Sequence, residues 1–138
     1  MPPVSEFMTP NPYAIGSDED LAMARSLMQI NRIHHLPVVD DDVLVGIVSD
    51  RDVLDRVSHD RVGDVMTRDV ATVSSNASLG EVLNLMEAGR IGSVVIAGEL
   101  GIEGIFTITD ALRVFAQLLH DGRIICGDWT ERRVAARR

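Results

Sequence analysis

The strongest constraint in this sequence is an internal repeat, which places Val4 in register with Val62. When residues 4–54 are aligned with residues 62–112 without a gap, thirteen positions hold the same residue in both copies. The identical pairs are Val4/Val62, Met8/Met66, Thr9/Thr67, Ser17/Ser75, Leu21/Leu79, Leu27/Leu85, Met28/Met86, Arg32/Arg90, Ile33/Ile91, Gly46/Gly104, Ile47/Ile105, Asp52/Asp110 and Leu54/Leu112. A repeat of this length usually marks a supersecondary unit that cannot bury its apolar face alone. We therefore expect one module built from two copies.

Helical spacing of apolar residues follows the opening of each copy. Residues 79–86 place leucine, valine and methionine on one helical stripe, with Asn76 or Ser78 as a candidate N-cap and Gly89 as a natural stop. In the first copy, an equivalent stripe begins at Leu21. There the candidate caps are Ser17 or Asp18.

β-Branched runs across a turn follow each of these helices and predict strand pairs. The expected strands are residues 36–39 and 43–48 in the first copy and 93–97 and 102–107 in the second. A short extended piece near residues 13–15 and 71–73, and a second helix at about 51–57 and 110–119, complete each copy. Residues 40–42 are a polar turn, since they lack the spacing of a calcium loop. The unit is β-α-β-β-α, and the fold class is α/β (α+β).

Composition narrows the classes of function and partner. The net charge is −8, and all thirteen basic residues are arginine. This acidic balance argues against nucleic acid as the main partner, because phosphate contacts dominate that affinity. The sequence has no apolar run near the ~20 residues that span a bilayer, and its start lacks the features of a secretory signal. With Cys126 as the single cysteine, we expect a cytoplasmic protein without membrane contact.

Two motifs recur in register with the repeat. Val-x-x-x-Met-Thr opens each copy at residues 4–9 and 62–67, and Gly-Ile-(Val/Phe)-(Ser/Thr)-x-x-Asp-x-Leu closes the strand pair at 46–54 and 104–112. Together they resemble the CBS-domain family, whose repeats occur in tandem as a Bateman module. The resemblance implies the boundaries of a single module over 1–138, with repeat 1 at about 4–58, repeat 2 at about 62–119 and a C-terminal tail at 120–138.

The resemblance implies two repeats packed through their sheets with pseudo-two-fold symmetry. It also implies clefts between the repeats that bind adenosine-containing ligands, commonly AMP, ADP or ATP, and in some members S-adenosylmethionine or NAD(H). Such modules often form homodimers through their helices. The expected function is a regulatory sensor that transmits nucleotide occupancy to an effector protein.

The closing motif also makes chemical sense without the resemblance. An aspartate three residues after a serine or threonine spans a strand-to-helix junction, at Ser49 with Asp52 and at Thr107 with Asp110. The carboxylates suit a ribose diol, and the helix start favours phosphate. The alternative interpretation is a capping box, which can accompany ligand contact.

Other candidates follow from the resemblance and from residue chemistry. In this family a basic residue before the first long strand often reaches phosphate. Arg32, His34 and His35 occupy this place. We expect one histidine to face the cleft and the other to face solvent, because successive strand residues point to opposite faces. Arg51 could clamp phosphate, or pair with Asp55 on the helix. The full set of candidate ligand-binding residues is Tyr13, Ala14, Ile15, His34, His35, Pro37, Ser49, Arg51, Asp52, Thr72, Val73, Arg90, Ser93, Thr107 and Asp110.

Repeat 2 departs from this pattern, because Gly92 and Ser93 stand where repeat 1 has two histidines. One occupied cleft is therefore favoured over two equal ones. No catalytic constellation or metal-ligand spacing is present in the sequence, and no enzyme activity is expected. Two alternatives stay open: an interaction or dimerisation module with vestigial clefts, and a redox or metal sensor using Cys126 and the histidines.

Overall fold

The computed structural model describes residues 2–54, 56 and 60–123. In the first copy the elements are η1 (a 3-10 helix, Val4–Glu6), β1 (Thr9–Pro10), α1 (Leu21–Asn31), β2 (His35–Asp40), β3 (Val43–Ser49) and α2 (Asp50–Val53). In the second copy they are α3 (Val62–Val65), β4 (Thr72–Val73), α4 (Leu79–Gly89), β5 (Ser93–Gly98), β6 (Gly101–Thr107) and α5 (Ile108–His120). The predicted mixed α/β class is confirmed, and each copy contains a helix, an antiparallel strand pair and a second helix in the predicted order.

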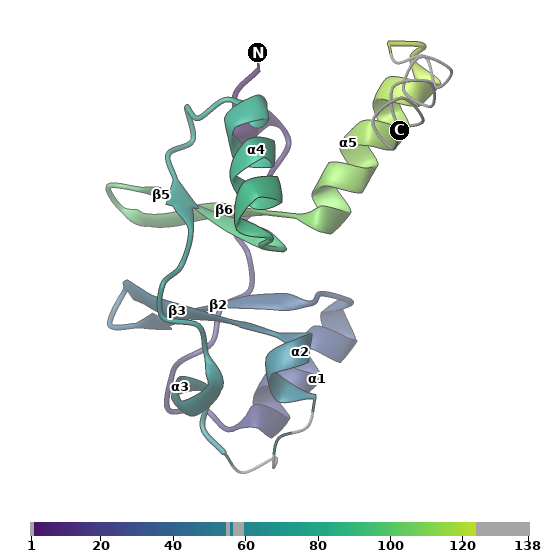
Figure 1. Ribbon diagram of the computed structural model, residues 1–138. Helices are drawn as coiled ribbons and strands as arrows, with labels where there is room; N and C mark the ends of the chain where they lie inside the picture. Colours follow the sequence, from purple (N-terminus) through teal and green to yellow (C-terminus); the bar gives the residue numbers. More distant parts are fainter. Residues whose placement is uncertain (1, 55, 57–59, 124–138) are drawn as a thin grey trace.

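Each strand pair is the centre of a small sheet. β5 and β6 belong to a four-stranded sheet of order β1-β6-β5-β4, in which β4 runs parallel to β5. β2 and β3 form the matching hairpin of the first copy, where Ile15 bridges to Val38 and Thr67 bridges to Ile47. Figure 1 shows the two hairpins facing each other, with α4 outside one and α1, α2 and α3 outside the other. β3 and β6 contact each other across the middle of the module.

The opening motif of each copy packs on the other copy. Val4 of η1 is fully buried in the cluster that contains Val82 and Phe106, and β1 pairs with β6. In return, Val62 of α3 is fully buried among the core residues of the first copy. This exchange ties the two copies into one module.

Polar side chains set the helix starts. Ser78 caps α4 in a capping box with Glu81, which confirms one of the two predicted caps. The prediction of Ser17 or Asp18 for α1 is wrong, because Asp20 accepts the hydrogen bond from the backbone N–H of Met23 at 2.9 Å. Ser17 instead donates its hydroxyl to Asp40 at 2.5 Å and its backbone N–H at 2.9 Å. These hydrogen bonds lower the pKa of the Asp40 carboxyl.

Arginines, not glycines, form the C-caps of α1 and α4. Arg32 ends α1 and Arg90 ends α4, both in the left-handed region with φ of 54° and 52°. Gly89, the predicted stop, is the last residue of α4 itself. The predicted polar turn is confirmed: Asp41 and Asp42 both have positive φ and join β2 to β3 as a two-residue loop.

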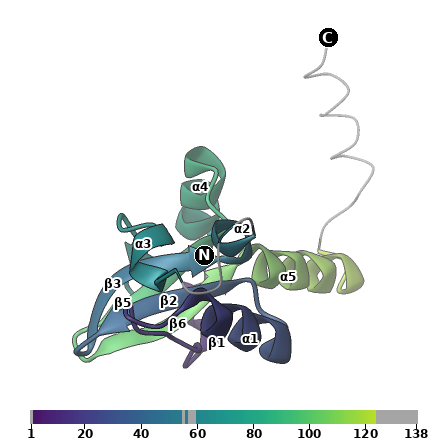
Figure 2. The same cartoon turned by 90° about the horizontal axis from the view of Figure 1, so that it is seen from below.

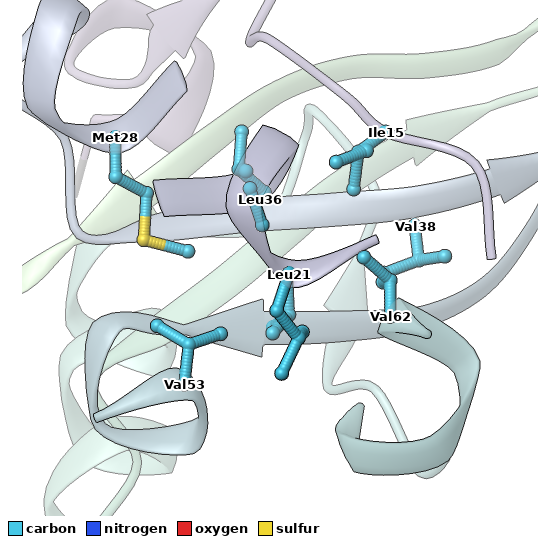
Figure 3. Close-up of a cluster of buried hydrophobic side chains, with 9 residues drawn as sticks. Ile15, Leu21, Met28, Leu36, Val38, Val53 and Val62 are labelled. Carbon is cyan, nitrogen blue, oxygen red and sulfur yellow. The ribbon is translucent and has the colours of Figure 1, made fainter. Parts of the chain in front are cut away.

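The apolar cores lie between each hairpin and its outer helices. In the first copy the core includes Leu21 of α1, Val38 of β2, Val53 of α2 and Val62 of α3, which point toward one another (Figure 3). Burial of each such side chain contributes about 1.5–3 kcal/mol. α5 extends to one side of the stacked sheets (Figure 2). None of the helices in the described part of the chain has the length and apolar character that crossing a bilayer requires.

Candidate functional site

A cleft of about 550 Å³ lies between the two copies. Its wall comes from three places: the segment after β1, the link from α1 to β2, and the junction of β6 with α5. We call it the Asp110 cleft. Its lining residues are Thr9, Pro10, Asn11, Pro12, Tyr13, Asn31, Arg32, Ile33, His34, His35, Ile105, Thr107, Ile108, Thr109, Asp110 and Arg113. The cleft therefore combines the start and middle of repeat 1 with the closing motif of repeat 2.

Asp110 is the anchor of this cleft and is only 1% exposed. Its Oδ2 accepts the backbone N–H of Thr107 at 2.9 Å and the Thr107 hydroxyl at 3.2 Å. Its Oδ1 accepts the hydroxyl of Thr9 at 2.9 Å and the guanidinium of Arg113 at 3.0 Å. Thr107 and Asp110 also form the capping box of α5. The capping interpretation therefore holds, and the same two residues line the cleft.

Basic groups gather on the α1–β2 side of the cleft. Arg32 is exposed there, because its left-handed cap conformation turns the chain out of α1. His34 is 63% exposed, and its Nδ1 lies 3.0 Å from Oδ2 of Asp50. His35 is half-buried, and burial lowers the pKa of its imidazole, since desolvation disfavours the charged ring.

Both histidines line the cleft, whereas the sequence predicts that one faces the cleft and the other faces solvent. Successive residues of a strand point to opposite faces, and that expectation holds only if both histidines belong to a strand. β2 begins only at His35, so His34 lies in the preceding link and strand alternation does not apply to it. His35 packs against the other copy: a Cβ added to Gly92 would lie 3.2 Å from its Nε2.

The third side of the cleft is apolar and open. Tyr13 is 54% exposed, so its ring is available for stacking, and Ile33, Ile105 and Ile108 line the same space. Ala14, Ile15 and Pro37 do not line it. Ile15 and Pro37 are buried, and the Ile15 backbone N–H donates to the Pro37 carbonyl at 3.0 Å.

The remaining candidates lie outside the Asp110 cleft. They are Ser49, Arg51, Asp52, Thr72, Val73, Arg90 and Ser93. Asp52 accepts the backbone N–H of Ser49 at 2.8 Å, in a capping box like that of Thr107 and Asp110. Arg51 is exposed on α2, and its alternative partner Asp55 lies outside the described residues.

Sequence reasoning did not single out Arg113 or Thr9 as site residues. Arg113 could have been found, because it follows Asp110 by three residues on a helix and so shares its face. Thr9 belongs to the opening motif, but its contact with Asp110 crosses 101 residues and leaves no signal in local spacing. Among the described residues, no cluster of three or more histidine, cysteine or acidic side chains could hold a metal ion. Cys126 and His59 lie outside those residues.

Comparison with known proteins gives a family and several relatives. A family model described as "CBS domain" matches residues 4–59 and 62–117. The inosine-5′-monophosphate dehydrogenase of Nitrosopumilus maritimus is 38% identical over 105 residues, which are 75% of this chain and 22% of that enzyme. The chain thus spans only about a fifth of the length of that curated relative.

Three solved structures match over most of their own length. A Vibrio cholerae protein for which a role in acetoin utilization has been suggested is 31% identical, with a TM-score of 0.79, covering 87% of this chain and 94% of that one. CBSX2 in complex with AMP is 26% identical, with a TM-score of 0.75 and coverage of 86% and 98%. The CBS domain pair of protein MJ0100, in complex with 5′-methylthioadenosine and S-adenosyl-L-methionine, is 25% identical, with a TM-score of 0.78 and coverage of 83% and 96%.

Proposed function

Because the chain belongs to the CBS-domain family, we propose that it is a regulatory module that binds AMP, ADP or ATP in the Asp110 cleft. A partner protein reads the occupancy of the cleft. One observation carries the proposal: a buried carboxylate, an exposed tyrosine and four basic side chains line one cavity of about 550 Å³. A volume of this order suits a small-molecule ligand.

Each part of a nucleotide has a complementary group in the cleft. The Asp110 carboxylate suits the ribose hydroxyls, because it offers acceptors only. Arg32, His34 and the N-terminus of α5 suit the phosphates, since basic side chains and the positive end of a helix dipole favour anions. The ring of Tyr13 suits the adenine base.

The basic side of the cleft favours phosphate over a cationic ligand. S-Adenosylmethionine carries a sulfonium, which Arg32 and Arg113 would repel. The solved structure of CBSX2 is a complex with AMP. That of the CBS domain pair of MJ0100 is a complex with 5′-methylthioadenosine and S-adenosyl-L-methionine. We therefore rank adenine nucleotides first, with S-adenosylmethionine and NAD(H) as the alternatives that the same titration compares.

A homodimer through α5 is part of the proposal. Ile108, Leu112 and Phe115 follow one another at helical spacing and are 54%, 63% and 46% exposed. An apolar stripe on one helix face is typical of a surface that pairs with another protein. The same stripe supports the second candidate function, an interaction module whose clefts stay empty.

Several expectations from the sequence stay predictions within this proposal. They are the absence of enzyme activity in this chain, the absence of nucleic-acid and membrane partners, and a cytoplasmic location. This chain matches 22% of the length of a dehydrogenase. The proposal therefore also covers a module that regulates a catalytic domain.

The proposal is tested by calorimetric titration of the protein with AMP, ADP, ATP, NADH and S-adenosylmethionine. We expect one adenine nucleotide to bind, and to add about 2.7 kcal/mol to the free energy of unfolding at 100-fold its Kd. Asp110→Asn keeps the shape of the cap and should weaken binding by about 10-fold or more, because it loses the charge that holds the ribose hydroxyls.

Asp52→Asn is the matched comparison, since Asp52 occupies the same position in the other copy. An equal loss of affinity in both variants would place the ligand in both clefts. No binding of any of the five compounds at millimolar concentration would overturn the sensor proposal and favour the interaction module.

A further inference from the structure

The Asp110 carboxylate already has a full set of donors. Oδ1 accepts from Thr9 and Arg113, and Oδ2 accepts twice from Thr107. A carboxylate has about four lone-pair sites, so no site is left for a ribose hydroxyl. A nucleotide can use Asp110 only if at least one of these donors leaves.

Arg113 is the donor that leaves at least cost. The two bonds from Thr107 belong to the capping box of α5. Thr9 is held by the pairing of β1 with β6. The side chain of Arg113 is 64% exposed, so its guanidinium can turn into water while the buried Asp110 carboxylate keeps its hydrogen bonds from Thr9 and Thr107.

The guanidinium of Arg113 has a new partner if the ligand carries phosphate. Arg113 lines the same cleft as Arg32 and His34, where the phosphates are placed in the proposed function. Its fork of donors suits phosphate oxygens. A phosphorylated ligand therefore offers the Arg113 guanidinium a phosphate in place of the Asp110 carboxylate. An unphosphorylated nucleoside offers it no anionic partner.

We propose that Arg113 is a specificity-determining residue that makes ribose binding at Asp110 depend on a phosphate in the same ligand. The inference rests on the proposed function and deepens it. Arg113 selects AMP, ADP and ATP against adenosine and other unphosphorylated adenosine compounds. The residue at the equivalent position of repeat 1 is Asp55, so the sequence gives this selection to one copy only.

The test is calorimetric titration of the wild type and Arg113→Gln with AMP and with adenosine. The variant should bind adenosine about 2- to 5-fold more tightly, because the competitor for Asp110 is gone. It should bind AMP about 10-fold more weakly, because a phosphate donor is lost. Opposite signs for the two ligands are the signature of the proposed role.

Two further variants separate this role from a general effect on the cleft. Thr9→Val removes the other donor to Oδ1 but no phosphate donor, so both affinities should shift in the same direction by similar factors. Arg56→Gln removes an exposed arginine that does not line the cleft and should change neither affinity. Thermal unfolding of Arg113→Gln checks that the variant is folded.

The outcomes also separate this inference from the function on which it rests. If the wild type binds neither ligand, the proposed function fails and the inference with it. If the wild type binds AMP but Arg113→Gln changes both affinities by the same factor, or changes neither, the selective role of Arg113 is wrong while the sensor function stands.

Discussion

Gly104 of repeat 2 lies directly against Met8 of repeat 1. A Cβ added to Gly104 would overlap the Met8 side chain and would lie 2.9 Å from the carbonyl oxygen of Thr9. The same relationship recurs in the other copy, where a Cβ on Gly46 would lie 2.5 Å from Sδ of Met66 and 3.0 Å from the carbonyl oxygen of Thr67. The glycine of the closing motif thus makes room for the methionine and threonine of the opening motif.

Gly104→Ala should therefore destabilise the module. The added methyl group meets backbone as well as a flexible side chain, so the strands must separate, at a cost of about 1–3 kcal/mol in the free energy of unfolding. Denaturant unfolding measures this loss, and Gly46→Ala should behave alike. Gly89→Ala is the control, because a Cβ added to Gly89 would lie 3.8 Å from its nearest neighbours. Alanine there should be neutral or stabilising. Unchanged stability in Gly104→Ala would contradict the close packing.

Sequence reasoning reached α1, α4, α5 and the two strand pairs because each has a local signal, whereas the extended piece predicted at residues 13–15 forms only an isolated bridge at Ile15. The apolar stripe that begins at Leu79 predicted α4, and Ser78 was one of the two candidates for its cap. The structure selects Ser78 through its capping box with Glu81. The exchange of opening motifs has no such signal. Thr9 of β1 pairs with Ile105 of β6, which lies far away in the sequence. Which sheet β1 joins therefore depends on how the two copies are arranged in space.

The site was predictable in part for the same reason. Thr107 and Asp110 are fixed by a motif that also caps a helix, so local sequence places both at one junction. The rest of the cleft comes from repeat 1, and nothing in the spacing says that His34, which pairs with Asp50, also lines the same cleft as Asp110. The cap of α1 was missed because Ser17 has a stronger partner in Asp40, which folding brings near.

The left-handed arginines give a second prediction. Arg32 and Arg90 hold a conformation that glycine adopts without strain, so Arg32→Gly and Arg90→Gly should each raise the free energy of unfolding by about 1 kcal/mol. Only Arg32 lines the Asp110 cleft, so only Arg32→Gly should also weaken AMP binding there, by about 10-fold. Unfolding and titration of the same samples check both effects, and a gain in stability without loss of affinity would exclude Arg32 from the site.

His35 makes stability depend on pH. Burial lowers the pKa of its imidazole below the ordinary 6.5, and His34 lowers it further, while Asp50 and Asp52 oppose the shift. Below pH 6.5 the unfolded chain therefore binds more protons than the folded one, and the free energy of unfolding falls as the pH falls. Denaturant unfolding between pH 7.5 and 5 should show this decline.

His35→Asn should flatten the decline in that pH range, because the titrating group is gone. His120→Gln removes an exposed histidine at the end of α5 and should leave the slope as in the wild type. An equal slope in His35→Asn and the wild type would assign the pH dependence to other groups.

The same histidine should link nucleotide binding to proton uptake. An AMP phosphate in the Asp110 cleft adds negative charge near His35 and so favours its imidazolium form. Binding should then take up protons near pH 6.5–7, which calorimetry measures by comparing buffers of different ionisation enthalpy. The phosphate itself also titrates near pH 6, so the part due to His35 is the difference between the wild type and His35→Asn. A lower proton uptake in the variant is the expected result, and identical uptake would mean that the phosphate lies too far from His35 to influence it.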